Sequence, residues 1–145
     1  MSSRPPVAVV TTVTSDAHTW NLVYLQLLLE ERGWQVINLG PCTPIGLVVE
    51  SLAESDVDLL LVSTVNGHGL LEAPALLDAV LHVPERVRPP VVLGGKLHTH
   101  GEVGDDEVRR LRDMGFAEVF VGETAVDTFH AYLSGFSASS TANAA

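Results

Sequence analysis

The sequence alternates short apolar runs with stretches whose apolar residues recur at helical spacing, and this alternation constrains the fold more than any other feature. Five short runs rich in aliphatic and β-branched residues predict buried strands: Val7–Thr12, Gln35–Leu39, Leu59–Ser63, Val91–Leu93 and Val119–Val121. The intervening and following stretches predict five helices: Asn21–Arg32, a segment opening at Thr43-Pro44, Leu70–Leu81, Asp105–Met114 and Ala125–Leu133. Strands that alternate with helices are typical of a parallel sheet with helices on both faces.

Right-handed crossovers between such strands favour one α/β domain of flavodoxin-like (Rossmann-like) architecture, a doubly wound five-stranded parallel sheet. Gly33 follows the first helix and suits the left-handed conformation after a helix end. Thr43 is expected to be an N-cap with Pro44 at the first helical position. The domain is predicted to span residues 1–133. Residues 134–145 are rich in Ser and Ala and predict a disordered C-terminal tail.

Composition excludes several classes of partner and location. The formal net charge of −10 disfavours nucleic acid and anionic membrane surfaces. No apolar run approaches the roughly 20 residues needed to span a bilayer, and the N-terminus lacks the pattern of a secretory signal. Cys42 is the only cysteine, which favours a reducing, cytoplasmic location. Trp20 and Trp34 are expected to be packing residues.

The loops expected at the carboxyl ends of the strands contain the least ordinary residues of the chain. Ligands of doubly wound sheets bind at this edge, and glycine allows a ligand to approach the backbone closely. Four of the six histidines fall in these loops. The loops are Thr14–Trp20, Ser63–Gly69, Gly94–Gly101 and Gly122–Thr124.

Asp16 and His18 stand two positions apart in the first of these loops, so their side chains can point the same way. A metal-bound histidine commonly donates its other ring N–H to a carboxylate, which fixes the tautomer and strengthens the ligand. The spacing alone leaves a plainer alternative open, in which Asp16 caps a helix and His18 is solvated. A zinc cluster of His68, His98 and His100 is disfavoured, because no H-x-x-x-H or C-x-x-C pair supports it.

Three pieces in order, Asp16-Ala17-His18, Ser63-Thr64-Val65 and Gly94-Gly95, resemble the signature D-x-H-x-x-G, S-x-L and G-G of cobalamin-binding domains. Gly67-x-Gly69 and Asp113-Met114-Gly115-Phe116 extend the resemblance, which covers residues 6–133. It is closest to the small subunit of glutamate mutase (methylaspartate mutase).

The resemblance implies a role for each matching residue. His18 would be the lower axial ligand of the cobalt, in place of the cofactor's own dimethylbenzimidazole, and Asp16 would hydrogen-bond His18. Ser63 would contact the displaced nucleotide tail, and Gly94 and Gly95 would make room for it. The full candidate set for cofactor binding is Ser15, Asp16, Ala17, His18, Thr19, Ser63, Val65, Gly67, Gly94, Gly95 and Gly122.

Two positions depart from the signature. Asn21 replaces the glycine that closes the first motif, and Val65 replaces the leucine of the second. Asparagine tolerates left-handed geometry and caps helices, but it is larger than glycine. We expect Asn21 to reshape the tail pocket or weaken cofactor affinity, with His18 ligation preserved.

The resemblance also implies an activity. It is adenosylcobalamin-dependent carbon-skeleton isomerisation, of L-glutamate to threo-3-methylaspartate, in which the cofactor performs the chemistry and the protein binds and orients it. One domain of this size leaves little room to enclose a substrate. We therefore expect a small-molecule substrate bound mainly by a larger catalytic partner with a TIM-type barrel, in a heterotetramer by family analogy, and no catalytic residues in this chain.

Three alternatives stand beside this reading. A methyl-carrying corrinoid protein or a cobalamin-responsive regulator uses the same module, usually after a further domain, whereas here the first strand begins near residue 7. An FMN-binding flavodoxin is suggested loosely by the segment 11–15, without the expected phosphate-binding glycine. A phosphoacceptor receiver domain needs an aspartate where this chain has Ser63.

Overall fold

The computed structural model describes residues 4–97, 99 and 103–144 of the chain. Its centre is a five-stranded sheet in which every neighbouring pair is parallel, with the strand order β2-β1-β3-β4-β5. This is the flavodoxin-like order, and the predicted fold class is confirmed. The strands are β1 (Val7–Thr11), β2 (Gln35–Asn38), β3 (Leu59–Thr64), β4 (Val91–Gly95) and β5 (Glu118–Phe120).

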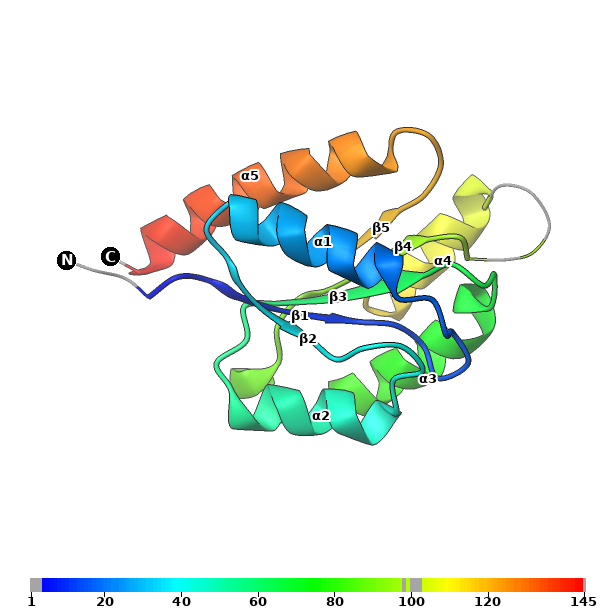
Figure 1. The fold of residues 1–145 in the computed structure, drawn as a ribbon, viewed down its shortest axis with the longest axis horizontal. Helices are drawn as coiled ribbons and strands as arrows, with labels where there is room; N and C mark the ends of the chain where they lie inside the picture. The colour runs from blue at the N-terminus through cyan, green and yellow to red at the C-terminus, as the bar shows by residue number, and fades with distance from the viewer. Residues whose placement is uncertain (1–3, 98, 100–102, 145) are drawn as a thin grey trace.

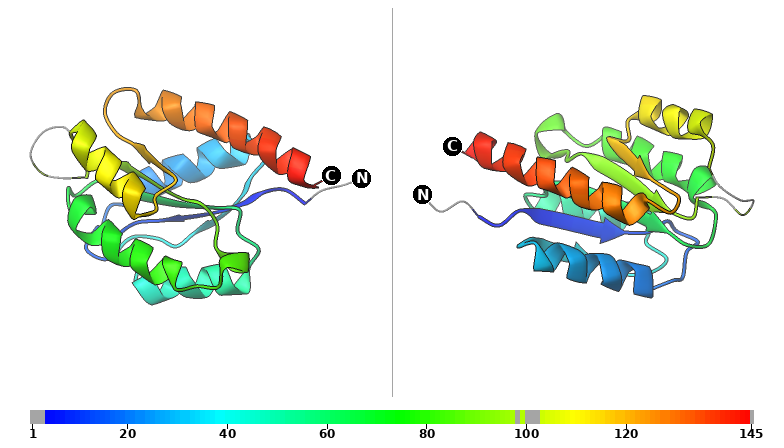
Figure 2. Two further views of the ribbon diagram at one scale, coloured as in Figure 1. Left: turned by 180° about the vertical axis from the view of Figure 1, so that it is seen from behind. Right: turned by 90° about the horizontal axis from the view of Figure 1, so that it is seen from above.

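Helices cover both faces of the sheet (Figures 1 and 2). Two of them, α1 and α5, lie on one face, and the other three lie on the opposite face. None of the helices within the described residues has the length and apolar character of a membrane span. The helices are α1 (Trp20–Glu31), α2 (Ile45–Glu54), α3 (Gly69–Leu81), α4 (Asp105–Met114) and α5 (Ala125–Ala144), with a short 3₁₀ turn at Glu85–Val87.

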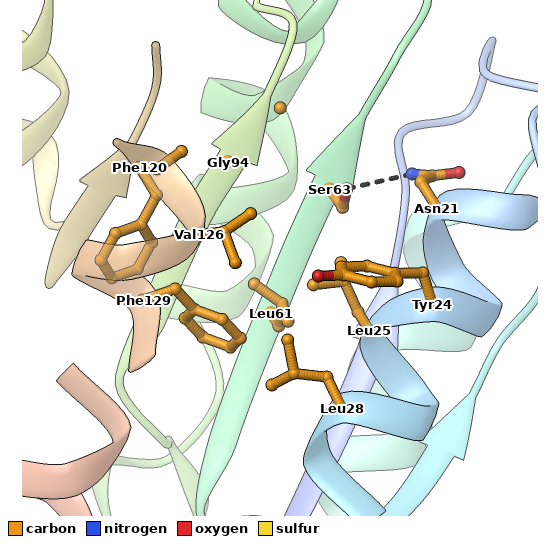
Figure 3. A pocket seen from close by; sticks show the side chains of 12 residues that line it. Asn21, Tyr24, Leu25, Leu28, Leu61, Ser63, Gly94, Phe120, Val126 and Phe129 are labelled. Carbon is orange, nitrogen blue, oxygen red and sulfur yellow. Dashed lines mark hydrogen bonds between the residues drawn. The ribbon is translucent and has the colours of Figure 1, made fainter. Parts of the chain in front are cut away.

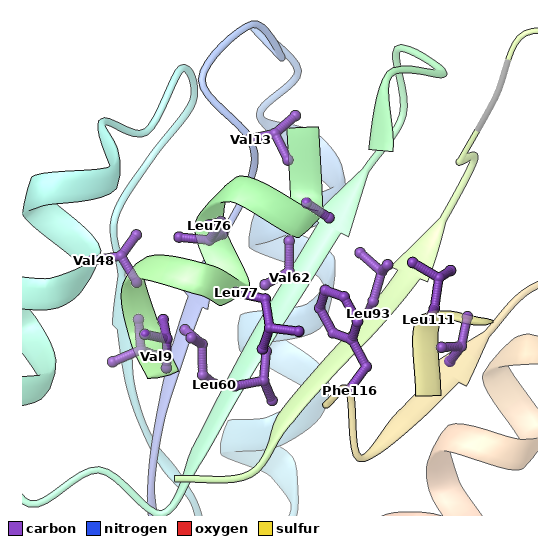
Figure 4. Close-up of a cluster of buried hydrophobic side chains, with 14 of the residues drawn as sticks. Val9, Val13, Val48, Leu60, Val62, Leu76, Leu77, Leu93, Leu111 and Phe116 are labelled. Carbon is purple, nitrogen blue, oxygen red and sulfur yellow. The ribbon is translucent and has the colours of Figure 1, made fainter. Parts of the chain in front are cut away.

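The two-residue period of β3 divides the core into two clusters. Leu60 and Val62 pack with α2, α3 and α4 (Figure 4), whereas Leu59 and Leu61 pack with α1 and α5. Successive strand residues point to opposite faces. Ser63 follows Leu61 by two positions, so its side chain lies on the face covered by α1 and α5.

Local signals were interpreted correctly at one helix end and wrongly at another. Gly33 follows α1 with a φ of 89°, the left-handed conformation that its position predicts. Thr43 does not cap α2, because Pro44 is the N-cap residue. The Thr43 hydroxyl instead donates to the carbonyl of Gly40 at 2.8 Å and accepts from the backbone N–H of Thr12 at 3.3 Å. A tertiary contact therefore takes the hydroxyl that a cap would use.

The length of the last helix and one tryptophan also differ from expectation. The sequence predicted a helix ending at Leu133, and helix α5 extends to Ala144. Phe129 and Leu133 anchor the helix in the core, and alanine, frequent beyond them, has the highest helix propensity. Trp34 is buried as predicted, with 3% of its surface exposed, but Trp20 is 83% exposed and is not a packing residue.

Candidate functional site

The loop between β1 and α1 is organised around the buried carboxylate of Asp16, which is fully inaccessible to solvent. Its Oδ1 accepts from the backbone N–H of His18 at 3.0 Å and from the His18 ring Nδ1 at 2.7 Å. Its Oδ2 accepts from the backbone N–H groups of Val65 and Asn66 at 2.6 and 3.1 Å. The same carboxylate thus orients the histidine and ties its loop to the loop after β3.

Two opposing effects set the charge of Asp16. Burial raises the pKa of its carboxyl group, but hydrogen bonds from the backbone of Val65, the backbone and ring of His18, and the backbone of Asn66 outweigh burial and lower the pKa below its usual value. Asp16 is therefore a fixed anion at neutral pH. The alternative in which Asp16 caps the first helix is wrong, because Thr19 occupies the N-cap of α1 without a side-chain cap bond.

The imidazole of His18 is fixed at one nitrogen and open at the other. An ionised carboxylate can only accept hydrogen bonds, so the Nδ1 of His18 carries a proton and donates a hydrogen bond to Asp16. Nε2 then holds a lone pair for a metal. The His18 side chain remains 55% exposed at the carboxyl edge of the sheet. The arrangement suits a monodentate ligand presented outward to a large metal complex, with the carboxylate fixing the tautomer and the orientation of the ring.

A second network holds the same loop from the start of α3. The Ser15 hydroxyl donates to the Glu72 carboxylate and accepts from the Asn66 side-chain amide at 2.9 Å. The Ser15 backbone N–H donates to Glu72 at 3.2 Å, and the His68 Nδ1 lies 3.3 Å from the Ser15 hydroxyl. Ser15 and Glu72 both contact His68 through this one nitrogen. A relay in which a histidine activates a nucleophile needs both ring nitrogens, so this group is not such a relay. It holds the loop in place, and we call Ser15, Asn66, His68 and Glu72 the clamp.

An elongated pocket of about 200 Å³ opens between α1 and α5 on the sheet face that bears Ser63 (Figure 3). One water needs only about 10–15 Å³ of such space, so the pocket can take a group of many atoms. The edge-to-face contact of Phe120 and Phe129, with ring centroids 5.3 Å apart, fixes the α5 side of the pocket. The lining consists of Asn21, Tyr24, Leu25, Leu28, Leu61, Ser63, Gly94, Gly95, Phe120, Ala125, Val126 and Phe129.

Asn21, one of the two departures from the signature, bridges the pocket to the sheet. Its amide nitrogen donates to the Ser63 hydroxyl at 3.0 Å (Figure 3). Its Oδ1 is buried and has no hydrogen-bond partner. An unpaired buried acceptor costs about 1–3 kcal/mol, so this atom lowers the stability of the fold locally. Val65 is the other departure from the signature. Its backbone N–H donates a hydrogen bond to Asp16, so the identity of its side chain does not affect that bond.

Gly94 and Gly95 end β4 at the pocket, but for different physical reasons. Gly95 has a φ of 99°, and an added Cβ would lie 2.1 Å from the carbonyl oxygen of Thr64. The backbone alone therefore demands glycine at this position. At Gly94 an added Cβ would lie 3.2 Å from the carbonyl oxygen of Phe120, and the φ lies outside the left-handed region. Gly94 keeps the pocket wall free of a side chain.

The other predicted residues lie along the same edge. Ala17 and Thr19 are exposed beside His18, Gly67 lies in the loop after β3 with a φ of 86°, and Gly122 follows β5 with a φ of 83°. Within the described residues, no three His, Cys, Asp or Glu side chains come together as a ligand set for a bare metal ion. His98 and His100, named in the zinc alternative, lie outside the described residues.

Sequence reasoning missed the clamp and most of the pocket lining. Glu72 and Asn66 reach Ser15 from another segment of the chain, and no spacing rule connects them. Leu25 and Leu28 belong to the apolar stripe of α1, which any core-facing helix would show. The only sequence signal for the pocket was the small size of Ser63 and Gly94, together with the hydroxyl of Ser63, on otherwise apolar strands.

A doubly wound domain with a carboxylate-held histidine at the strand edge and an apolar slot beside it has room and a ligand for a large metal-containing cofactor. The family model described as the B12 binding domain matches residues 6–132. The chain belongs to this family.

Several curated relatives share most of their length with the chain. The glutamate mutase sigma subunit of Halobacterium salinarum is 33% identical over 128 residues, which cover 88% of this chain and 84% of the relative. The glutamate mutase sigma subunit 1 of Haloarcula marismortui is 30% identical over 120 residues, covering 83% and 78%. The sigma subunit of Fusobacterium nucleatum is 24% identical over 128 residues, covering 82% and 87%.

Solved structures share the fold at lower identity. A cobalamin-binding protein of Desulfitobacterium hafniense superposes with a TM-score of 0.61 at 21% identity and 81% coverage of this chain. The monomethylamine corrinoid protein of Methanosarcina barkeri gives a TM-score of 0.64 at 22% identity and 89% coverage. The chain spans about half the length of these solved chains, 53% and 57%.

Proposed function

We propose that this chain is the cobalamin-binding subunit of glutamate mutase, an adenosylcobalamin-dependent carbon-skeleton isomerase. It would bind cobalamin with His18 on the cobalt and with the nucleotide tail displaced into the pocket between α1 and α5. The observation that carries the proposal is the Asp16–His18 pair, fixed through Nδ1 and open at Nε2, next to an elongated pocket.

The residues present fit this cofactor at both ends. At one end, the exposed imidazole of His18 would supply one nitrogen ligand to the cobalt. At the other end, the glycine wall of β4 and the apolar lining provide room for a flat base.

Bound adenosylcobalamin supplies the radical chemistry, and the residues of this chain bind and orient it. Asp16 keeps the His18 proton on Nδ1 and holds the ring toward solvent. Val65 and Asn66 keep Asp16 ionised and in place, and Glu72 holds Ser15, so the loop keeps one shape. We propose that no residue of this chain acts as a catalytic acid or base. We also propose that the protein is cytoplasmic.

The isomerase activity would require a larger catalytic partner, which we propose to be a TIM-type barrel that binds the substrate. Two large apolar residues are exposed near the N-termini of the helices that follow β1 and β3: Trp20 is 83% exposed and Leu71 is 80% exposed. Their exposure supports a partner protein that covers this edge of the sheet. The names of the curated relatives support glutamate mutase over a methyl-carrying corrinoid protein. The solved corrinoid proteins share the fold alone.

Electron paramagnetic resonance of the protein mixed with cob(II)alamin tests the proposal. The wild type, His18→Ala and His82→Ala would be compared, each with and without nitrogen-15 in histidine. His82 is the matched control, since it is exposed at the end of α3 and its ring bonds only to the carbonyl of Asp78 in its own helix. We expect superhyperfine splitting that changes with the label in the wild type and in His82→Ala, and that is lost in His18→Ala.

Two results would contradict the proposal. One is a splitting that is insensitive to the label, which would mean that the cofactor's own base stays on the cobalt. The other is an unchanged cob(II)alamin spectrum with folded protein, which would mean that no complex forms.

A further inference from the structure

The buried carboxylate that orients His18 belongs to a closed ring of contacts. Ser15 precedes Asp16 in the chain, and its hydroxyl accepts from the side-chain amide of Asn66 at 2.9 Å. The backbone N–H of Asn66 donates in turn to the Oδ2 of Asp16 at 3.1 Å. The ring therefore runs from Asp16 through Ser15 and Asn66 back to Asp16, so a shift of one member displaces the others.

Glu72 fastens this ring to a helix of the core. Both of its carboxylate oxygens accept from Ser15, one from the hydroxyl and the other from the backbone N–H at 3.2 Å. Glu72 lies in the first turn of α3, and this helix packs into the core through Ala73, Leu76 and Leu77. The position of the ring is thus set by a helix that cannot shift without disturbing the core.

A plainer role for Glu72 would be to offset the dipole of its own helix, as an acidic residue in a first turn does. That role requires only a carboxylate near the helix N-terminus, without any directed contact. The Glu72 side chain is instead 29% exposed, and both of its oxygens bond to Ser15, which lies 57 residues away. Hydrogen bonds to an ionised acceptor are stronger than those between neutral groups, so these contacts favour a role in the His18 loop.

We propose that Glu72 is a positioning residue for cobalt ligation, an inference that rests on the proposed function. Glu72 acts through Ser15, which places Asp16 and thereby the ring of His18. In the proposed complex, His18 competes with the cofactor's own base for the cobalt. A loop that already has the ligating shape competes at all times, whereas a loop with several shapes competes only in the fraction that is competent.

Electron paramagnetic resonance of cob(II)alamin, with excess protein labelled with nitrogen-15 in histidine, measures this competition without any assay of activity. The label changes the splitting from a histidine nitrogen and leaves the splitting from the cofactor's own base unchanged, so the spectrum gives the ratio of histidine-ligated to base-ligated cobalt. In Glu72→Gln, one accepting oxygen cannot serve both donors of Ser15. We expect this ratio to fall at least about tenfold relative to the wild type, or about 1.4 kcal/mol.

Two further variants test the route through Ser15. Ser15→Ala breaks the same link from the other side and should also lower the ratio of histidine-ligated to base-ligated cobalt. The double variant Ser15→Ala, Glu72→Gln should lose little more than the worse of the two single variants, because residues that act through one another are not additive. Asp78→Asn is the matched control, since it removes one negative charge from an exposed position of the same helix and should leave the ratio unchanged.

Circular dichroism and urea denaturation establish which variants are folded, and only these are compared. An unchanged ratio in folded Glu72→Gln or Ser15→Ala would overturn the inference and leave the proposed function standing. Losses that add in the double variant, or an equal loss in Asp78→Asn, would overturn it in the same way. A wild-type splitting that does not respond to the label would contradict the proposed function itself, and the inference with it.

Discussion

The His18 loop and the pocket between α1 and α5 lie side by side at one edge of the sheet, but they are built in opposite ways. The loop is held by directional bonds, with four donors on the buried carboxylate of Asp16. The pocket is held by packing, and its one buried polar contact leaves the Oδ1 of Asn21 unpaired. The carboxylate oxygens of Asp16 are therefore paired within the protein, whereas the Oδ1 of Asn21 is not.

This difference fits the two demands that a long cofactor makes. A metal ligand must stand at a defined position and in one tautomer, and hydrogen bonds to a fixed anion achieve this. A bulky organic tail needs space and removal from water, which an apolar pocket supplies without directional bonds. Changes in the loop should therefore alter stability and ligation together, whereas changes in the pocket lining should alter affinity more than stability.

Gly95→Ala should produce the largest loss of stability, although Gly95 lines the pocket. An added Cβ would lie 2.1 Å from the Thr64 carbonyl oxygen at a φ of 99°, so the backbone must move. We expect a loss of about 3 kcal/mol or more in the free energy of unfolding, measured by urea denaturation without cofactor.

Gly94→Ala is the matched control for this substitution, because its φ lies outside the left-handed region. It should lose much less stability than Gly95→Ala. Equal losses for the two variants would show that crowding along β4, and not the backbone conformation of Gly95, limits both positions.

Asp16→Asn should lower stability by about 2 kcal/mol at neutral pH and weaken cofactor affinity about 10- to 100-fold. An amide has one accepting oxygen, so it cannot serve both the His18 donors and the Val65 and Asn66 donors. Urea denaturation and fluorescence titration measure the two effects. Asp113→Asn, at an exposed position, is the control and should change stability by less than about 0.5 kcal/mol.

The pH profile gives the Asp16 prediction its sign. The folded pKa of Asp16 lies below the ordinary value of 3.8, so its ionisation stabilises the fold fully above that pH. The contribution is lost as the pH falls through the folded pKa. The stability gap between wild type and Asp16→Asn should therefore shrink below about pH 4. A gap that stays constant there would contradict the role of Asp16 as a buried anion.

Asn21→Ala should have the smallest effect on stability, within about 1 kcal/mol. The substitution removes one hydrogen bond to Ser63 but also removes a buried acceptor without a partner, and the two effects oppose each other. Cobalamin affinity should fall by more than stability does, because the Asn21 side chain lines the proposed tail pocket and positions the Ser63 hydroxyl there. A large loss of stability would show that the Asn21–Ser63 bond holds α1 on the sheet.

The interpretation of the sequence succeeded where neighbouring residues determine the outcome. The alternation of apolar runs with helical stripes gave the parallel sheet and its strand order, and the two-residue period of β3 gives the face on which Ser63 lies. The spacing of Asp16 and His18 allowed a bond between them, and the resemblance to the cobalamin-binding signature implied it; the structure has this bond between Oδ1 and Nδ1.

The cap predicted at Thr43 failed because its hydroxyl bonds to Gly40 and Thr12 across the loop. The last helix also extends beyond Leu133, where the sequence predicted its end, since a helix anchored in the core can propagate along the chain. In both places, a local signal was outweighed by structure elsewhere in the fold.

The sequence by itself determined the class of fold and the position of Asp16 and His18 in the loop after the first strand, at the carboxyl edge of the sheet. Tertiary structure alone decided that the backbone of Val65, 49 residues away, fixes Asp16 as an anion and that Glu72, 57 residues away, clamps Ser15. It alone brought α1 and α5 together to form the pocket. The physical reason is that side-chain periodicity is set by near neighbours, whereas these contacts exist only after the layers of the domain have packed.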